Sequence, residues 1–299
     1  MRKGQKLRTD GSKGSLAVRG KLQLFLFLLL LWAGCVPQFP GDRKTFQTLM
    51  LCLASRSGIC VPEYPFNPAN VSAMQFWLAA DDVVPSTGTV VSRWPDRSAN
   101  ANHVVQSTAA MQPTYTTGAA PYFHPVVYFD GGDQLTGLNT ALTGADFTFF
   151  VVYNRPVAGG HPFLEVGQVT LTNAKSLGVN GSLGVDVCSR NVACAPGPAG
   201  VTYTNNTWHA VTVTYSGSGN QKQTQWRDGA SVGSGTAQAL AFDTVGFASV
   251  GNAPNGGAGF VGYIAEIIYY NRILSSSEID YVNCYMTLKF AIGSALFCK

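Results

Sequence analysis

The acidic side chains of this 299-residue chain are its candidates for the hydrolysis of glycosidic bonds. Their spacing along the sequence argues against that activity. Cleavage of a glycosidic bond uses two carboxyl groups roughly 5 to 10 Å apart. Two glutamates that alternate with a further acid on one strand would lie on the same face and could meet this requirement. The four glutamates contain no such pair; they are Glu63, Glu165, Glu266 and Glu278. We therefore expect no catalytic activity.

Glu266 is the one acid inside an apolar run, which extends from Ile264 to Tyr270. A buried carboxylate must be paired with a cation or hydrogen-bonded. We expect Arg272, a tyrosine or a backbone turn to be its partner. Glu266 is interpreted as a structural polar anchor rather than as a general acid.

Two oxygen-rich turns could bind a metal ion. Asp130 and Asp133 flank a Gly-Gly pair, and a second turn contains Asp96, Asn100 and Asn102. Ca²⁺ takes six to eight oxygen ligands of this kind. Asp and Asn are also common in turns for purely backbone reasons. Ca²⁺ at Asp130 and Asp133 is the candidate cofactor, and no other cofactor is expected.

Loop residues are the expected contacts to a ligand. A rigid β scaffold usually presents a few exposed aromatic and polar side chains on its loops. The loops in question are residues 96–103, the turn after Trp226 and residues 252–259. The predicted ligand-binding residues are Asp96, Asn100, Asn102, His103, Trp226, Asn252 and Asn255.

The elements that must position these residues are short strands separated by turns. Strands are predicted at 76–78, 90–94, 125–129, 147–153, 208–215, 224–227, 245–250 and 264–270 because these runs are rich in β-branched and aromatic residues. Ser275 and Glu278 then have the spacing of a capping box, and Ile279, Val282 and Met286 recur at helical spacing. The pattern predicts an all-β domain that ends in one short helix.

Six motifs in this order resemble the laminin-G-like jelly roll of the concanavalin A-like lectin/glucanase superfamily. They are FWLAADD, WPDRSANANH, VVYFDGGDQL, FTFFVVY, WHAVTVTYSG with WRDGASVGS, and the closing GYIAEIIYYNRILSSSEIDYVNCYMTLKF. The resemblance covers residues 74–292 and implies a two-sheet antiparallel jelly-roll sandwich with one short C-terminal helix. Members bind glycans, mediate protein adhesion or cleave glycans. The glucanase branch carries an E-x-D-x-E motif, which this chain lacks.

The first 34 residues have the pattern of an export signal. Seven of the 20 basic residues but only one of the 16 acidic residues precede Gly34, so the rest of the chain has 13 basic and 15 acidic residues, a net charge of −2. The apolar run at 22–32 is too short to span a bilayer. The sequence LWAGC resembles a bacterial lipobox with Cys35 as the acylated residue; Trp32 departs from that pattern, and ordinary secretion is the alternative.

This interpretation divides the chain into a signal peptide (1–34), a tether and lead-in segment (35–73) and the laminin-G-like domain (74–299). It predicts export and lipid anchoring at the bacterial outer membrane or cell surface. The membrane would be contacted only through the lipid. A nucleic-acid partner is not expected, because it would need clustered Lys and Arg residues, and the chain after residue 34 has a net charge of −2.

Seven cysteines agree with export. With Cys35 lipidated, six remain in three sequence-local couples. They are Cys52 with Cys60, Cys188 with Cys194, and Cys284 with Cys298. Six cysteines allow fifteen pairings, so neighbour pairing is a hypothesis. Their spacing is not that of a zinc site.

These observations predict an exported, lipid-anchored, non-catalytic binding domain that recognises glycans or glycosylated or matrix proteins. Two alternatives stay open: a glycan-active hydrolase of the same superfamily, and a structural or adhesive surface protein without a sugar ligand.

Overall fold

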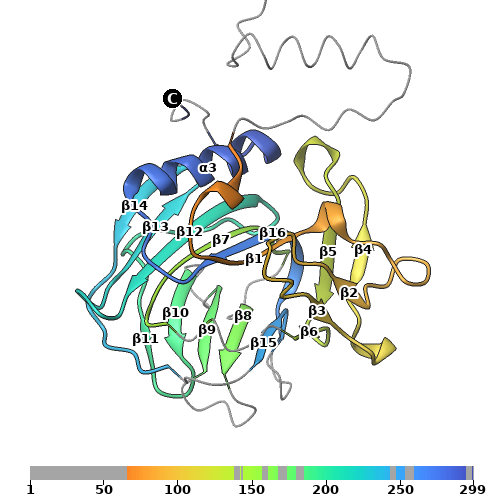
Figure 1. The fold of residues 1–299 in the computed structure, drawn as a ribbon, viewed down its shortest axis with the longest axis horizontal. Helices are drawn as coiled ribbons and strands as arrows, with labels where there is room; N and C mark the ends of the chain where they lie inside the picture. Colours follow the sequence, from red (N-terminus) through yellow and green to blue (C-terminus); the bar gives the residue numbers. More distant parts are fainter. Residues whose placement is uncertain are drawn as a thin grey trace, which may run out of the picture. The chain divides into compact units, whose positions relative to one another are not determined.

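The computed structural model describes residues 66–137, 142, 144–156, 161–167, 174–179, 185–242, 247–252, 259–293 and 298. These residues form two antiparallel sheets of eight strands each and one α-helix, α3 (Figure 1). Four short 3-10 turns lie in the connections: η1 (Pro68–Asn70), η2 (Ala80–Asp82), η3 (Ala109–Met111) and η4 (Pro121–Phe123).

Sheet A is the sheet next to the helix. Its strand order is β14 (Ala230–Ser234), β13 (Gln223–Arg227), β12 (Trp208–Ser216), β7 (Asp146–Asn154), β16 (Val261–Tyr270), β5 (Val126–Asp130) and β4 (Thr114–Thr116), and β1 (Met74–Ala79) also pairs with β16. The long strands β7 and β16 are central because both of their faces are apolar. On β7, Phe149 and Val151 point into the sandwich, whereas Phe150 and Val152 point towards the helix.

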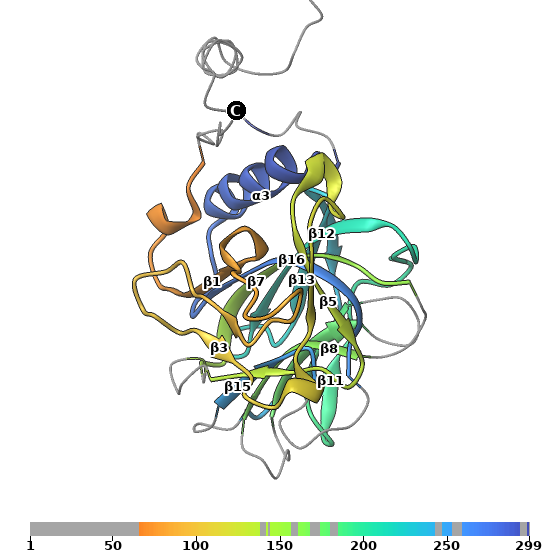
Figure 2. The ribbon, with the colours of Figure 1, turned by 90° about the vertical axis from the view of Figure 1, so that its right-hand side faces the viewer.

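Sheet B lies on the other side of the core. Its order is β11 (Ala193–Ala195), β10 (Val185–Ser189), β9 (Lys175–Val179), β8 (His161–Gly167), β15 (Phe247–Val250), β6 (Leu135–Thr136), β3 (Val104–Val105) and β2 (Arg93–Trp94). Figure 2 shows α3, sheet A and sheet B as successive layers.

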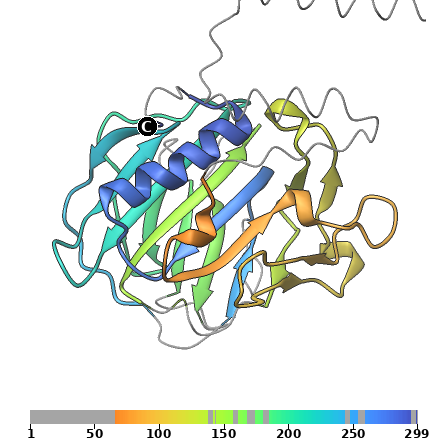
Figure 3. The same ribbon diagram turned by 45° about the horizontal axis from the view of Figure 1, so that its top comes forward.

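The helix α3 (Ser276–Phe290) covers the outer face of sheet A and crosses its strands (Figure 3). The predicted capping box is present, with Ser275 and Glu278 each hydrogen-bonded to the other's backbone N–H. Ile279, Val282 and Met286 pack on the sheet. Contacts with the helix begin before residue 74, because the Phe66 and Tyr281 rings lie 5.0 Å apart.

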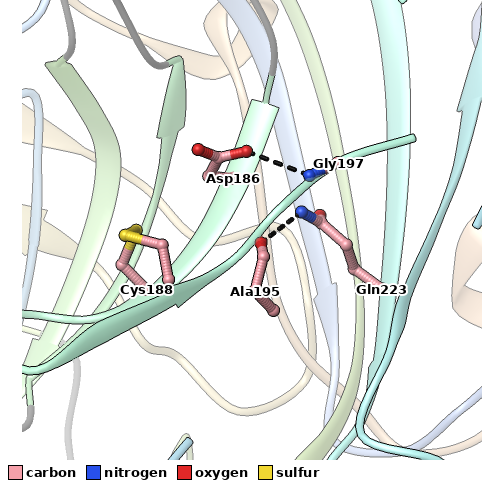
Figure 4. Close-up of a disulfide and its surroundings, with 6 residues drawn as sticks. Asp186, Cys188, Ala195, Gly197 and Gln223 are labelled. Carbon is pink, nitrogen blue, oxygen red and sulfur yellow. Dashed lines mark hydrogen bonds between the residues drawn. A yellow bond between two sulfur atoms is a disulfide. The ribbon is translucent and has the colours of Figure 1, made fainter. Parts of the chain in front are cut away.

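Two of the predicted disulfides are present. Cys188 and Cys194 join β10 to β11, and Cys284 and Cys298 join α3 to the chain end. Beside the first bridge, Asp186 accepts a hydrogen bond from the Gly197 N–H at 3.1 Å, which holds the chain after β11 against β10 (Figure 4). Cys35, Cys52 and Cys60 lie outside the described residues.

The predicted fold class is confirmed: the chain forms a two-sheet antiparallel sandwich with one C-terminal helix. The strand predicted at 90–94 is shorter than expected. Only Arg93 and Trp94 form β2, because Val90 makes isolated bridges to Thr87 and Thr114 instead.

Candidate functional site

Four side chains from neighbouring strands form a row across the outer face of sheet A. Tyr128 on β5 pairs with Tyr263 on β16, Tyr263 pairs with Asn154 on β7, and Asn154 pairs with Trp208 on β12. Tyr263 and Trp208 pack against the apolar cluster under α3, which places them on the outer face. We call these four residues the aromatic row.

The rings of the aromatic row are close together and tilted. The Tyr128 and Tyr263 centroids are 4.9 Å apart with an interplanar angle of 45°, and those of Trp208 and Tyr263 are 6.3 Å apart at 44°. These two distances limit the span of the three rings to roughly 11 Å, less than three strand spacings of about 4.8 Å would give. All four side chains are partly exposed.

The polar ends of the aromatic row are available to a ligand. Neither tyrosine hydroxyl, nor the Asn154 amide, nor the Trp208 indole N–H forms a hydrogen bond with another residue in the described part of the chain. A surface with aromatic bodies and open polar tips is suited to a ligand that has both apolar faces and hydroxyl groups.

The row is bordered by an acidic turn, residues 130–133. Asp130 lies two residues after Tyr128 and therefore on the same face of β5. The Asp130 N–H donates to the Asp133 carboxylate at 3.0 Å, and Asn252 donates to the Gly131 carbonyl at 3.1 Å. The turn is thus held against the chain that follows β15.

Burial of Asp133, together with the neighbouring charge of Asp130, raises the pKa of Asp133 to about 6. Burial, the Tyr263 hydroxyl and the two aspartates also raise the pKa of Tyr128. The acidic turn and the aromatic row are therefore close enough to interact electrostatically.

The acidic turn does not complete a calcium shell from the described residues. Asp130 and Asp133 each have one carboxylate oxygen bonded to a backbone N–H. In the described ranges, no group of three or more His, Cys, Asp or Glu side chains is arranged to hold a metal ion. Calcium prefers six to eight oxygens, so calcium binding at this turn stays a prediction.

The predicted ligand residues at 96–103 form a local hydrogen-bond network at the edge of the sandwich. Asp96 accepts from the backbone N–H groups of Trp77, Ser98 and Asn102. Asn100 and Asn102 donate to the Gln75 carbonyl, and His103 accepts from the Asp96 N–H. These side chains bind the chain's own backbone, and they lie apart from the aromatic row in sequence and in strand pairing.

The other predicted ligand residues are dispersed. Trp226 is partly exposed on β13, opposite Thr212, and packs against the cluster under α3. Its partner Thr212 lies four positions from Trp208 on β12, so Trp226 does not belong to the row. Asn252 is 4% exposed and holds the acidic turn. Asn255 lies outside the described residues.

Glu165 is a second buried carboxylate, on β8 of sheet B. Its side chain is 3% exposed and accepts from Arg190 at 2.5 Å. Burial raises the pKa of Glu165, and the Arg190 charge and the Ser176 hydroxyl oppose that shift only in part. Cross-strand pairing places Glu165 between Ser176 and Ser249.

Sequence reasoning missed all four members of the aromatic row as ligand contacts. Tyr128, Tyr263 and Trp208 all fall in segments that were predicted as strands or adjoin them, at alternating positions that face outwards. That alternation was a usable signal. The cross-strand register that brings them together was not readable, because it depends on which strands are neighbours.

A model of the concanavalin A-like lectin/glucanases superfamily matches residues 129–280. This match covers half of the chain and includes most of the strands of both sheets. The chain belongs to this superfamily. A search of curated protein sequences found no match. Among the described residues, no helix has the length and apolarity needed to cross a bilayer.

Similar solved structures share low sequence identity with the chain. Domain 4 of AbnA, a GH43 extracellular arabinanase from Geobacillus stearothermophilus in complex with arabinotriose, is 15% identical over 69% of this chain and 96% of that one, with a TM-score of 0.49. Trypanosoma rangeli sialidase is 16% identical over 88% of this chain, with a TM-score of 0.45. NanB sialidase from Streptococcus pneumoniae is 15% identical over 54%, with a TM-score of 0.40.

The chain spans 38% of the Trypanosoma sialidase and 28% of the Streptococcus one. The prediction of a non-catalytic protein is nevertheless wrong, because the similar structures come from an arabinanase and from sialidases.

Proposed function

We propose that this domain binds glycan chains and that the aromatic row is its binding surface. The observation that carries the proposal is the alignment of Tyr128, Tyr263, Asn154 and Trp208 on four adjacent strands. Sugar rings have apolar faces of C–H groups that stack on aromatic rings, and equatorial hydroxyls that accept and donate hydrogen bonds. Membership of a superfamily of lectins and glucanases supports the same class of ligand.

The row has the properties that such recognition requires. The strands of sheet A hold the rings, so little conformational entropy is lost when a ligand binds. Asn154 supplies an amide donor and an amide acceptor between two aromatic side chains. The partly buried bodies of Tyr263 and Trp208 are fixed by the cluster under α3.

The proposal is tested by glycan-array screening of the domain, followed by calorimetry on variants. Tyr263→Ala is expected to weaken binding at least tenfold, because Tyr263 is the centre of the row. Phe123→Ala is the matched control, since Phe123 is an aromatic residue that is 86% exposed and lies off the row. If wild type and Tyr263→Ala bind a glycan with equal affinity, and thermal melting shows that both proteins are folded, the assignment of the binding surface is refuted.

Glycan hydrolysis is the second candidate function. Two described carboxyl groups, those of Asp133 and Glu165, have pKa values raised by burial, as a general acid requires at neutral pH. Release of reducing ends from any bound oligosaccharide would establish turnover. Loss of that release in Asp133→Asn or Glu165→Gln, with binding kept, would identify the acid.

The proposed setting is an exported protein anchored by a lipid on Cys35, with glycans or glycosylated matrix proteins as partners. The LWAGC sequence and the cysteine usage support this setting. Cys35→Ala is expected to move the protein from the detergent phase to the aqueous phase in phase partitioning. Unchanged partitioning would leave ordinary secretion as the better explanation.

A further inference from the structure

The rings of the aromatic row are rotated relative to one another, and this rotation limits the shape of a ligand. The interplanar angle is 45° between Tyr128 and Tyr263 and 44° between Tyr263 and Trp208. Adjacent strands of a sheet rotate by roughly 20 to 25°, so side chains in equivalent positions cannot remain coplanar across four strands. A flat crystalline surface needs coplanar rings to make contact with all of them.

The row runs perpendicular to the strands, because cross-strand pairing defines it. Tyr128, Tyr263, Asn154 and Trp208 each come from a different strand, in the spatial order β5, β16, β7 and β12. A ligand that contacts all four must therefore extend across the strands for up to roughly 11 Å, the largest separation that the ring distances allow. Because neighbouring rings of the row are not coplanar, a ligand that stacks on more than one of them cannot present a single flat face.

The charges beside the row are negative at the Tyr128 end. Asp130 is exposed on the same face of β5, and Asp133 lies behind it in the turn. Arg155, the residue after Asn154, is 2% exposed and bonds to Asn205, so it does not present its charge on this face. The Asp130 carboxylate would repel an anionic glycan, and dissolved salt would weaken that repulsion.

We propose that the ligand of the aromatic row is a single, soluble, electrically neutral glycan chain whose sugar rings do not lie in one plane, bound across the strands of sheet A. Crystalline polysaccharide surfaces and acidic glycans are excluded as preferred ligands. This inference rests on the proposed glycan-binding function and adds the shape and charge of the ligand.

The test uses the intact protein with three kinds of probe. The neutral soluble probes are cellohexaose, xylohexaose, laminarihexaose, mannohexaose and arabinohexaose, measured by calorimetry. The acidic probe is hexagalacturonate at low salt. The insoluble probes are microcrystalline cellulose and chitin, measured by retention in pull-down. At least one neutral hexasaccharide is expected to bind at least tenfold more tightly than hexagalacturonate, with no retention on either solid.

Charge selectivity is tested separately by Asp130→Asn, which should reduce the ratio of neutral to acidic affinity several-fold. Asp280→Asn removes the same charge from an exposed position on α3 and should leave that ratio unchanged.

The outcomes separate the two proposals. Retention on crystalline cellulose or chitin, or tighter binding of hexagalacturonate than of every neutral probe, would overturn this inference while glycan binding itself stood. Binding to none of the probes and to no glycan of the array would overturn the proposed function, and this inference with it. A selectivity ratio that Asp130→Asn does not change would refute the role of the acidic turn.

Discussion

The Lys289 ammonium group donates to the Glu266 carboxylate at 2.6 Å, in the buried layer between α3 and sheet A. Glu266 is fully buried and Lys289 is 3% exposed. Tyr285 also donates to Glu266, at 2.8 Å, and Trp77 donates through its indole N–H. Lys289 forms a second ion pair with Asp81, again at 2.6 Å. This network fixes the helix to β16 and to η2.

Lys289→Met is predicted to destabilise the fold by about 3 to 5 kcal/mol, because it leaves the buried Glu266 carboxylate without its cation, whereas the more exposed Asp81 keeps His124 as a partner. Glu266→Gln should cost less, since Lys289 keeps Asp81 as a partner. Urea unfolding measures both, and Lys222→Met on the β12–β13 hairpin is the control, with an expected change within about 0.5 kcal/mol. A larger cost for Glu266→Gln than for Lys289→Met would contradict this account of the network.

Much of the fold could be predicted because it depends on local patterns. The apolar run at 147–153 had to be a strand buried on both faces, and the Ser275–Glu278 spacing located the start of α3 to the residue. The neighbour disulfides Cys188–Cys194 and Cys284–Cys298 followed from sequence proximity. Segments with more Gly and fewer β-branched residues, such as β9 and β14, gave no clear signal.

The candidate site was harder to predict because it depends on pairing between distant segments. Tyr128 and Trp208 are 80 positions apart in the chain and share a face only through β16 and β7. Glu266 was expected to find Arg272 or a tyrosine; the tyrosine is present, but the cation is Lys289, and Arg272 pairs with Glu278. Residues chosen because they lie in turns, such as Asp96, bond to the backbone instead.

Asp133→Asn is predicted to stabilise the protein near pH 7 relative to wild type. Burial raises the pKa of Asp133 to about 6 in the folded state, above the ordinary value of 3.8. The folded wild type therefore binds more protons than the unfolded chain between these values, and its stability falls as the pH rises from about 4 to above 6. The amide lacks this penalty and keeps an acceptor for the Asp130 N–H.

The expected gain at pH 7 relative to pH 4 is about 1 to 2 kcal/mol after allowance for solvent screening. Thermal melts of both proteins from pH 4 to pH 8 measure it. Asp280→Asn controls for the change in net charge. Parallel melting curves for wild type and Asp133→Asn across this range would show that Asp133 titrates near its ordinary pKa in the folded protein.

Calcium is predicted to stabilise the wild type if Asp130 and Asp133 bind it. A ligand present at one hundred times its dissociation constant adds about 2.7 kcal/mol to the free energy of unfolding. Melts in millimolar CaCl₂ and in EDTA compare the two states, with Asp133→Asn as the variant that should lose the difference. An identical melting temperature of the wild type in both buffers would refute the prediction that calcium binds at this turn.

Asn154→Ala is predicted to weaken glycan binding about five-fold without a large change in stability. The Asn154 amide lies between Tyr263 and Trp208 and forms no hydrogen bond with another described residue, so its removal leaves no group of the folded protein unpaired. Each hydrogen bond that the amide forms with a ligand hydroxyl contributes about 0.5 to 1.5 kcal/mol.

Asn220→Ala is the matched control, because Asn220 lies beyond the opposite end of β12 from Trp208. Calorimetry with the tightest neutral hexasaccharide gives the affinities, and urea unfolding gives the stabilities. Unchanged affinity in Asn154→Ala, together with loss of affinity in Tyr263→Ala, would limit recognition to the aromatic rings alone.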